Sequence, residues 1–177
     1  MSTQTESRLA HLADIHEIKQ VLYTYCHGVD HSAEDELRSC FHPDATHEHG
    51  EYKGKSHDFI PFILEFNKDR RGQTHAITNP IIRIDGDRAI CDCQFSAYNR
   101  STPKDGQINQ LFVKGRFIDR FERRNGAWKI IHRLGVHDRE SVTDVPEATG
   151  AVAGGLRSGA KPNDPYYEML AEFLRGK

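Results

Sequence analysis

The sequence predicts an α+β fold in which a curved antiparallel sheet wraps around helices from the N-terminal part of the chain. Up to about residue 70, apolar residues recur at intervals of three and four, which is the period of amphipathic helices. From Gln73 onward apolar and polar residues alternate, which is the period of strands. Helices followed by a run of strands are typical of α+β domains and not of alternating βα units.

Three helices are predicted before Gln73. The first has one apolar stripe, and Asp14 with Glu17 has the spacing of a capping box at its start. Ser32 is expected to open a short second helix that ends at the turn "HPDA", because Pro43 cannot continue it. Ser56 is a possible cap of the third, whose first turn is limited by Pro61. The apolar positions are Ile15, Ile18, Leu22, Tyr25 and Val29 in the first helix, Leu37, Cys40 and Phe41 in the second, and Phe59, Phe62, Ile63 and Phe66 in the third.

The predicted strands form two hairpins. Residues 74–84 and 88–100 flank the tight turn "DGD", and residues 108–123 and 128–136 flank "RNGAW". A short strand is expected around "THEHGEY", residues 46–52. The sheet is therefore expected to be built mainly from neighbours in the chain.

Length and charge narrow the class of protein. The 177 residues are enough for one domain, which we place at 1–138, followed by residues 139–177 as a Gly/Ala-rich flexible connector and a C-terminal docking helix. A net charge of −2 gives no general attraction to nucleic acid or to a membrane. No signal peptide or long apolar segment is visible, so a cytoplasmic protein with a small organic partner is expected. Cys26, Cys40, Cys91 and Cys93 are expected to be reduced, half-buried thiols.

The tail contains two different segments. Residues 148–159 are rich in Gly and Ala, whereas "DPYYEMLAEFLRGK" has Tyr166, Met169, Leu170 and Phe173 at helical spacing. An isolated helix of this length is marginal in water, so we expect it to dock, either as a lid over a cavity or against a neighbouring subunit.

Several short motifs together resemble the SnoaL-like branch of the nuclear transport factor 2-like (cystatin-like) superfamily. They are "YCHGVD", "FHPDA", "YKG", "THAITN" and "FERRNGAWKIIHR", and the resemblance covers roughly residues 9–138. Within this branch the pattern is similar to scytalone dehydratase, hexachlorocyclohexane dehydrochlorinase and bile-acid 7α-dehydratase. The resemblance implies a cone-shaped cavity, cofactor-free lyase chemistry and an Asp-His pair at Asp30 and His75. Because the first two of these enzymes are trimers, it also implies a homotrimer, with a dimer as the second choice.

The residues themselves support the pair. A carboxylate in the last turn of a helix faces the negative end of the helix dipole, so Asp30 breaks a local rule, as functional residues often do. Gln73, His75, Ile77 and Asn79 share one face of the predicted strand. If the ring reaches Asp30, the carboxylate fixes the tautomer in which the facing nitrogen is protonated, and the other nitrogen is left free as a base. The alternatives are a solvated Asp30 and a core histidine.

Three further residues are candidates for catalysis. By the resemblance, Tyr25 is a pocket tyrosine. His49 lies near the position where the dehydratases have a tyrosine that binds substrate oxygen, and a histidine at this position would act as an acid or as a hydrogen-bond donor. Arg133 matches a pocket arginine, and the alternation of the last strand puts it on the face opposite His132 and also opposite Trp128 and Ile130. Core packing of Tyr25 and a surface salt bridge of Arg133 are the alternatives. The expected substrate-binding residues are Tyr52, Phe62, Phe66 and Asn79.

The predicted function is a lyase without cofactor or metal that acts on a small hydrophobic cyclic or aromatic molecule. Dehydration and loss of formaldehyde from a lignin-derived diaryl compound are both compatible with the resemblance. A ketosteroid-isomerase-like isomerase and a non-catalytic small-ligand-binding module remain open, because one fold supports all of these. His47 and His49 lie on one strand face and would be the start of a metal site, but such sites need further ligands.

Overall fold

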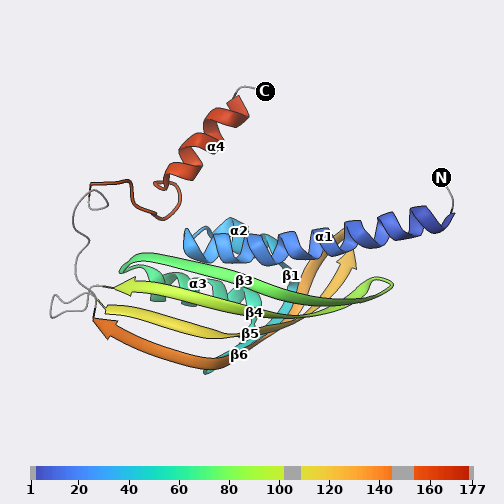
Figure 1. The fold of residues 1–177 in the computed structure, drawn as a ribbon, viewed down its shortest axis with the longest axis horizontal. Coiled ribbons are helices and arrows are strands. Elements are labelled where there is room, and N and C mark those ends of the chain that lie inside the picture. The colour runs from blue at the N-terminus through green and yellow to red at the C-terminus, as the bar shows by residue number, and fades with distance from the viewer. Residues whose placement is uncertain (1–2, 102–108, 145–153, 176–177) are drawn as a thin grey trace.

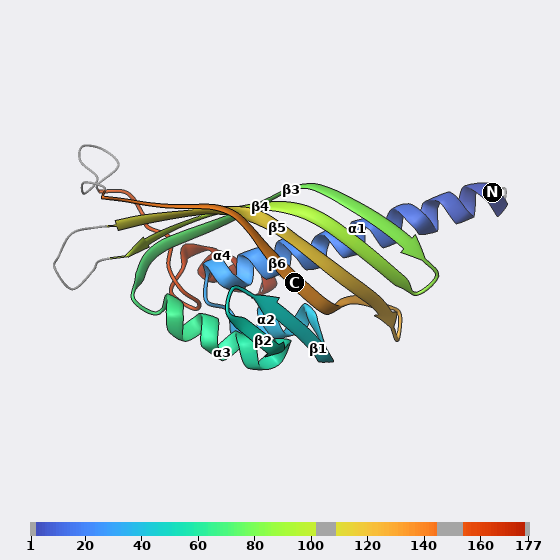
Figure 2. The same cartoon turned by 90° about the horizontal axis from the view of Figure 1, so that it is seen from below.

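The sheet and helices form two layers, with the helices on the concave side of a strongly curved sheet (Figures 1 and 2). The computed structural model describes residues 3–101, 109–144 and 154–175. The helices are α1 (Thr3–Asp30), α2 (Glu34–Ser39), α3 (Ser56–Asn67) and α4 (Pro165–Arg175). The strands are β1 (Phe41–His49), β2 (Tyr52–Lys55), β3 (Arg70–Asp85), β4 (Arg88–Ser101), β5 (Asn109–Arg124) and β6 (Ala127–Asp144). The predicted α+β class is confirmed.

The six strands are ordered β2-β1-β6-β5-β4-β3. Both predicted hairpins are present, and their turns explain why. Asn125 and Gly126 have φ of 54° and 80°, and Gly86 has φ of 59°, which is the left-handed backbone that Asn and Gly adopt at low cost in tight hairpin turns. The exception to antiparallel pairing is β1, which runs parallel to β6. The sheet is therefore mixed at this one junction.

The helix starts differ from the prediction. α1 begins at Thr3, so Asp14 lies inside the helix, where its Oδ1 accepts hydrogen bonds from Arg123 Nη1 at 2.6 Å and Trp128 Nε1 at 2.9 Å. α2 begins at Glu34 without a side-chain cap, and Ser32 lies in the preceding turn with φ of 50°. The Asp14 carboxylate thus ties α1 to the sheet instead of capping the helix.

Pro43 lies in a strand and not in the predicted turn. β1 pairs with β6 at Phe41 and again from Thr46, and the register shifts between these two positions. Pro43 falls in the unpaired stretch, where a residue without an N–H costs no ladder hydrogen bond. The helix before it ends at Ser39.

The core lies between α1 and the concave face of β4, β5 and β6. Ile18, Leu22 and Val29 of α1 are at most 3% exposed, as are Phe117 and Phe121 of β5. All four cysteines are free and buried, so the expectation of half-buried thiols underestimates their burial. Among the described residues, no helix combines the length and apolar character that crossing a bilayer requires.

Two bulges in β6 decide which of its residues face inward. Arg120 pairs with His132 and Phe121 with Ile130, so Ile131 is an extra residue; Lys114 pairs with Arg139 and Gly115 with His137, so Asp138 is another. Each extra residue reverses the alternation of faces. The inward positions are Trp128, Ile130, Arg133, Gly135, His137 and Glu140. The simple alternation predicted for this strand is wrong beyond Ile130.

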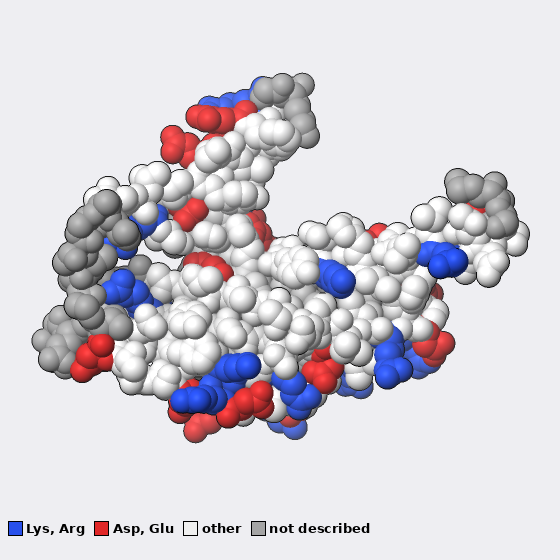
Figure 3. Space-filling view, in the orientation of Figure 1, with Lys and Arg blue, Asp and Glu red and all other residues white. Residues whose placement is uncertain are grey.

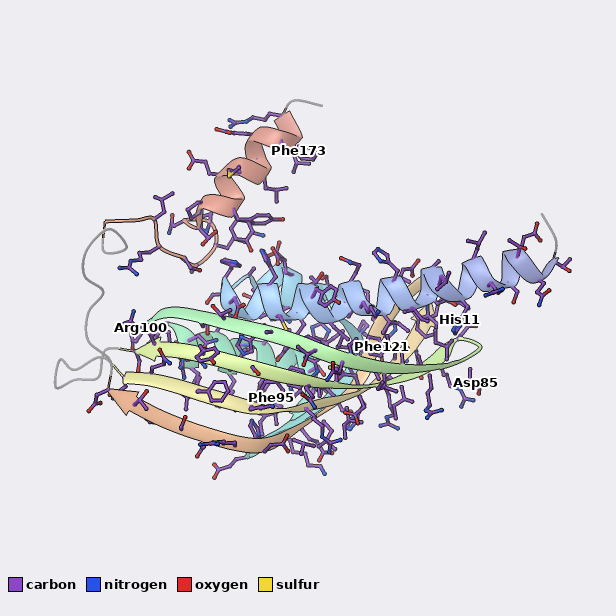
Figure 4. All side chains as sticks on the ribbon, in the orientation of Figure 1. His11, Asp85, Phe95, Arg100, Phe121 and Phe173 are labelled. Atoms are coloured by element: carbon purple, nitrogen blue, oxygen red, sulfur yellow. The ribbon has the colours of Figure 1, made fainter. Side chains whose placement is uncertain are left out.

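The C-terminal segment contacts the body at the end of α1 and at α2. Tyr167, which is 8% exposed, donates to Glu36 Oε1 at 2.8 Å, and Lys161 binds Asp35 at 2.7 Å. The rest of α4 extends away from the body, and Met169 and Phe173 are 70% and 63% exposed (Figures 1 and 4). β6 continues to Asp144, so residues 139–144 belong to the sheet. The first part of the Gly/Ala-rich stretch, residues 148–153, lies outside the described residues.

The surface in the view of Figure 3 has Lys and Arg side chains interspersed with Asp and Glu along the sheet side, without a continuous basic area.

Candidate active site

Asp30 and His75 are in direct contact at the end of α1. His75 Nδ1 lies 2.6 Å from Asp30 Oδ1, and the backbone N–H of His75 donates to Asp30 Oδ2 at 2.9 Å. Each side chain is 14% exposed. His75 therefore binds both carboxylate oxygens of Asp30, and this two-point contact fixes the position and the plane of the imidazole ring.

The neighbouring inward residue of β3 holds this arrangement in place. Gln73 Nε2 donates to the carbonyl oxygen of Val29 at 2.6 Å and lies 3.4 Å from that of Asp30. The last carbonyls of a helix have no partner within the helix, so the side-chain amide satisfies them and docks β3 against the helix end. Because alternate strand residues share a face, His75 follows Gln73 to the same place.

The contact also selects the tautomer of His75. An ionised carboxylate only accepts hydrogen bonds, so Nδ1 must carry the proton that Asp30 Oδ1 accepts. Nε2 of the neutral ring is then unprotonated and is the nitrogen left for the cavity that His75 lines. A carboxylate in this position also stabilises the imidazolium that forms when the base takes a proton.

The cavity has a volume of about 570 Å³ and lies between α3 and the concave sheet. Most of its wall is aromatic or aliphatic, with a few polar groups, which is typical of sites for small organic molecules. The apolar lining is Val29, Phe59, Phe62, Ile63, Phe66, Phe95, Ala97, Leu111, Val113 and Phe117. The polar lining is Tyr25, His49, Asn67, His75, Asn99, His137 and Glu140.

A second pair of imidazoles lines the cavity at β1 and β6. The ring centroids of His49 and His137 are 4.7 Å apart at a near-perpendicular angle. Burial, with a smaller contribution from His137, lowers the pKa of His49 to about 4, so its ring is neutral near pH 7. Gly135 makes room for it, because a Cβ there would lie 2.4 Å from His49 Nδ1. His49 can donate or accept a hydrogen bond in this state, but it is not a protonated acid.

Arg133 lies beneath the cavity wall and not in the cavity. Its Nε and Nη2 bind the two oxygens of Asp119 at 2.7 and 2.6 Å, and both side chains are fully buried. The guanidinium carbon is 3.9 Å from the Tyr25 ring centroid and 4.1 Å from that of Phe117. The two roles predicted for Arg133, a pocket residue and a surface salt bridge, are both wrong. Arg133 forms a buried ion pair with Asp119, and its guanidinium supports the rings of Tyr25 and Phe117.

Tyr25 is the wall residue that contacts this pair most closely. Burial raises the pKa of Tyr25 to about 12, an effect that the positive charge of Arg133 partly offsets. The phenol is therefore neutral at physiological pH. Its ring also makes edge contacts with Phe41 and Phe117 at 5.8 Å, so Tyr25 both packs in the core and lines the cavity.

The structure brings most of the predicted site residues together. Tyr25, His49, Phe62, Phe66 and His75 line the cavity, and Asp30 lies directly behind His75.

Two predicted substrate-binding residues lie elsewhere. Tyr52 packs behind the wall, with its ring centroid 5.0 Å from that of Phe59. Asn79 is exposed, with φ of 52°, at a register shift between Thr78 and Ile81. The left-handed residue at this irregularity breaks the alternation that would have put Asn79 beside His75.

Several lining residues were not predicted. Phe95 and Asn99 continue the inward alternation that begins at Cys91 and Cys93, so the sequence contained the signal for them. His137 and Glu140 lie beyond the point where the last strand was expected to end. The inward orientation of His137 depends on the bulge at Ile131, and that of Glu140 on the further bulge at Asp138; the sequence offers no comparable signal for either bulge.

His47 does not form a metal site with His49. Its ring is stacked on Phe59 at 4.0 Å and is fully buried, and burial is the main cause that lowers its pKa to about 2. Across the described part of the chain, no three His, Cys, Asp or Glu side chains gather in a metal-binding arrangement.

Comparison with known families decides where the chain belongs. Residues 10–134 match the SnoaL-like domain. The chain is a member of this family. The resemblance predicted from the sequence motifs is therefore confirmed. Comparison with curated proteins gives no match.

Solved structures share the fold of this SnoaL-like protein at low sequence identity. A scytalone dehydratase-like protein from Novosphingobium aromaticivorans is 18% identical with a TM-score of 0.67, covering 83% of this chain and 97% of that one. A type 2 hexachlorocyclohexane dehydrochlorinase (LinA) is 21% identical with a TM-score of 0.67, covering 84% and 99%. A cystatin-like protein of unknown function from Nostoc punctiforme is 18% identical with a TM-score of 0.58, covering 71% and 92%. At these identities the likeness shows a shared fold.

Proposed function

We propose that this SnoaL-like protein is a cofactor-independent lyase that acts on a small hydrophobic cyclic or aromatic molecule. The observation that carries the proposal is the two-point contact between Asp30 and His75 at the wall of a largely aromatic cavity. It supplies an oriented neutral base next to a space for an apolar ring. A role in the catabolism of aromatic compounds follows from such a substrate.

In an elimination, His75 Nε2 takes a proton from the substrate carbon. The electrons of that C–H bond form a double bond to the neighbouring carbon, and the leaving group departs with its own electron pair. Asp30 stabilises the imidazolium formed at His75. The proton then passes to the leaving group, which is released as water or as a hydrogen halide.

Loss of formaldehyde uses the same base at a different atom. His75 takes the proton of a primary hydroxyl, a C=O bond forms, and the adjacent C–C bond breaks. The electron pair of the broken bond stays on the remaining carbon, where it expels a neighbouring leaving group or takes a proton. The polar groups that line the cavity near this base include Tyr25 and His49, which as neutral groups act as hydrogen-bond donors to substrate oxygen.

Arg133 contributes indirectly in this proposal. Its guanidinium holds the rings of Tyr25 and Phe117 at about 4 Å on the side away from the cavity, so it positions the wall and does not touch the substrate.

A panel of aromatic, terpenoid and steroid alcohols and halides tests the proposal by mass spectrometry of the products. The expected result is a mass loss of water, formaldehyde or hydrogen halide that survives a metal chelator and disappears in His75→Gln. His16→Gln, at an exposed position of α1, is the matched control and should retain the activity. Binding without any product would indicate a ligand-binding module, and a product of unchanged mass would indicate an isomerase.

We also propose that the protein is a homo-oligomer, with a trimer first and a dimer second. Exposed apolar side chains on the outer face of β3 and β4 support association through the sheet, namely Ile81, Ile90 and Tyr98, which are 61%, 44% and 49% exposed. Light scattering at micromolar concentration should show a mass above that of the monomer, and a monomer alone would contradict the proposal.

A further inference from the structure

A second pocket adjoins the aromatic cavity on the far side of Asp30. It has a volume of about 470 Å³ and is bounded by the end of α1, the end of α3, the first residues of β3 and residues 158–160 of the C-terminal segment. Its character differs from that of the first cavity, because its lining includes Asp30, Asn67, Lys68, Arg70 and Gln73. We call it the polar pocket.

The polar pocket and the aromatic cavity share their boundary. Asn67 lines both. Arg70 of the polar pocket has its guanidinium carbon 4.3 Å from the ring centroid of Phe66, which lines the aromatic cavity. Asp30 of the polar pocket is hydrogen-bonded to His75 of the aromatic cavity. At each of these places a single side-chain contact separates the two spaces, so a molecule with an apolar and a polar end reaches both where one of these contacts opens.

Two donors of the polar pocket, on Arg70 and Asn67, are not used within the described protein. Arg70 has no acidic partner among the described residues, and its Nε is buried without a hydrogen-bond partner. Asn67 is 5% exposed, and its Nδ2 is likewise buried and unpartnered. A partly buried cation without a counter-ion is costly unless a ligand supplies the negative charge.

The other charged side chains at the pocket already have partners. Lys68 is paired with Glu65, and both oxygens of Asp30 accept hydrogen bonds from His75, although the carboxylate keeps its negative charge. The unpartnered buried side-chain acceptor of the pocket is Gln73 Oε1, which suits a single water or hydroxyl. Arg70 is therefore the charged group of the pocket whose donors are left for a ligand, and a planar guanidinium matches a carboxylate in a two-point contact.

We propose that the polar pocket binds the carboxylate of the substrate through Arg70 and Asn67 while its ring occupies the aromatic cavity. The substrate class is then an aromatic or alicyclic carboxylic acid. This inference rests on the proposed function for what happens to the ring, but the binding itself needs no turnover.

Isothermal titration calorimetry with two probes of the same shape tests the inference. Biphenyl-4-carboxylate should bind the wild-type protein about 10- to 100-fold more tightly than biphenyl-4-carboxamide, the range expected for one charge-assisted contact. In Arg70→Gln this preference should vanish while the carboxamide affinity stays the same. Arg70→Lys should keep part of the preference. Arg116→Gln, which removes a charge paired with Asp92 on the outer face, should keep all of it.

The outcomes separate this inference from the proposed function. His75→Gln should abolish turnover and leave the carboxylate preference intact, so that loss of catalysis and loss of the preference are measured separately. Equal binding of the two probes by the wild type overturns the inference, and this comparison needs no variant to fold. Displacement of the carboxylate probe by equimolar inorganic phosphate would show a free-anion site and would overturn the assigned substrate class.

Discussion

Both carboxylate oxygens of Asp30 are occupied by one residue, His75, which donates its backbone N–H and its ring Nδ1–H. The two residues are distant in the sequence and meet because Gln73 docks β3 on the last carbonyls of α1. The geometry determines a tautomer, and the tautomer can be measured without a substrate.

In its neutral form the ring of His75 should carry the proton on Nδ1 and leave Nε2 unprotonated. ¹⁵N-detected NMR of the imidazoles measures this directly, with His75→Gln identifying the signal. In Asp30→Asn the side-chain NH₂ can no longer stabilise the imidazolium, and turnover should fall by about 10²- to 10⁴-fold, the usual contribution of a positioned base. Asp85→Asn, an exposed carboxylate at the end of β3, is the control. A wild-type signal for Nε2–H would contradict the proposed mechanism.

Removing the partner of Arg133 should be far more costly than removing a surface partner. Asp119→Ala leaves a fully buried guanidinium without its bidentate carboxylate, and the free energy of unfolding should fall by about 3–5 kcal/mol. Asp92→Ala breaks the exposed pair with Arg116 and should cost about 0–1 kcal/mol. Urea denaturation measures both. Equal losses would show that the buried pair is not stabilised as its geometry indicates.

Gly135→Ala should disturb the cavity through His49. The new Cβ would lie 2.4 Å from His49 Nδ1, so the ring must move, at a cost of about 1–3 kcal/mol for overpacking. Gly72→Ala is the matched control, since nothing lies within 4 Å of a Cβ there. In a double-mutant cycle, His49→Ala should relieve most of the cost. Additive effects of the two changes would place the clash elsewhere.

Stability should depend on pH through His49. Its pKa falls from 6.5 in the unfolded chain to about 4 in the folded protein, so the folded state prefers the neutral ring. This contribution is complete above about pH 6.5 and is lost as the pH falls toward 4, because only the unfolded chain takes up the proton in that window, with a slope of at most about 1.4 kcal/mol per pH unit. Urea unfolding of His49→Phe between pH 7 and 4 should show a shallower decline, while His16→Gln should follow the wild type.

Deleting the residues after Gly159 should weaken substrate binding and leave the Asp30–His75 contact intact. The deletion removes the anchors Lys161 and Tyr167 and one wall residue of the polar pocket, Ala160. The expected result is lower turnover with an unchanged His75 tautomer by NMR. Full activity of the truncated protein would show that the segment is an appendage.

Elements that depend on neighbours in the chain could be predicted from the residues alone. Asn125-Gly126 and the Gly86 turn specify their hairpins because few residues accept a left-handed backbone. The apolar stripe of α1 has the helical period. The start of the helix at Thr3 was not predicted, because Asp14, which looked like an N-cap, accepts hydrogen bonds from the sheet instead. Motifs shared with the SnoaL-like family pointed to Asp30 and His75. Secondary-structure propensity alone could not have predicted that these two residues are in contact.

The way in which distant segments meet depends on the packing of the whole fold. The bulges at Ile131 and Asp138 turn Arg133, His137 and Glu140 to one face, and an alternation read along the sequence cannot anticipate an extra residue that is set by the partner strand. Burial, too, is a property of the assembled layers. It makes Arg133 a support of the wall and leaves Arg70 without an acidic partner among the described residues, although both are arginines of the sheet. The sequence shows which side chains are charged, but the fold decides which of them lie close enough to form ion pairs.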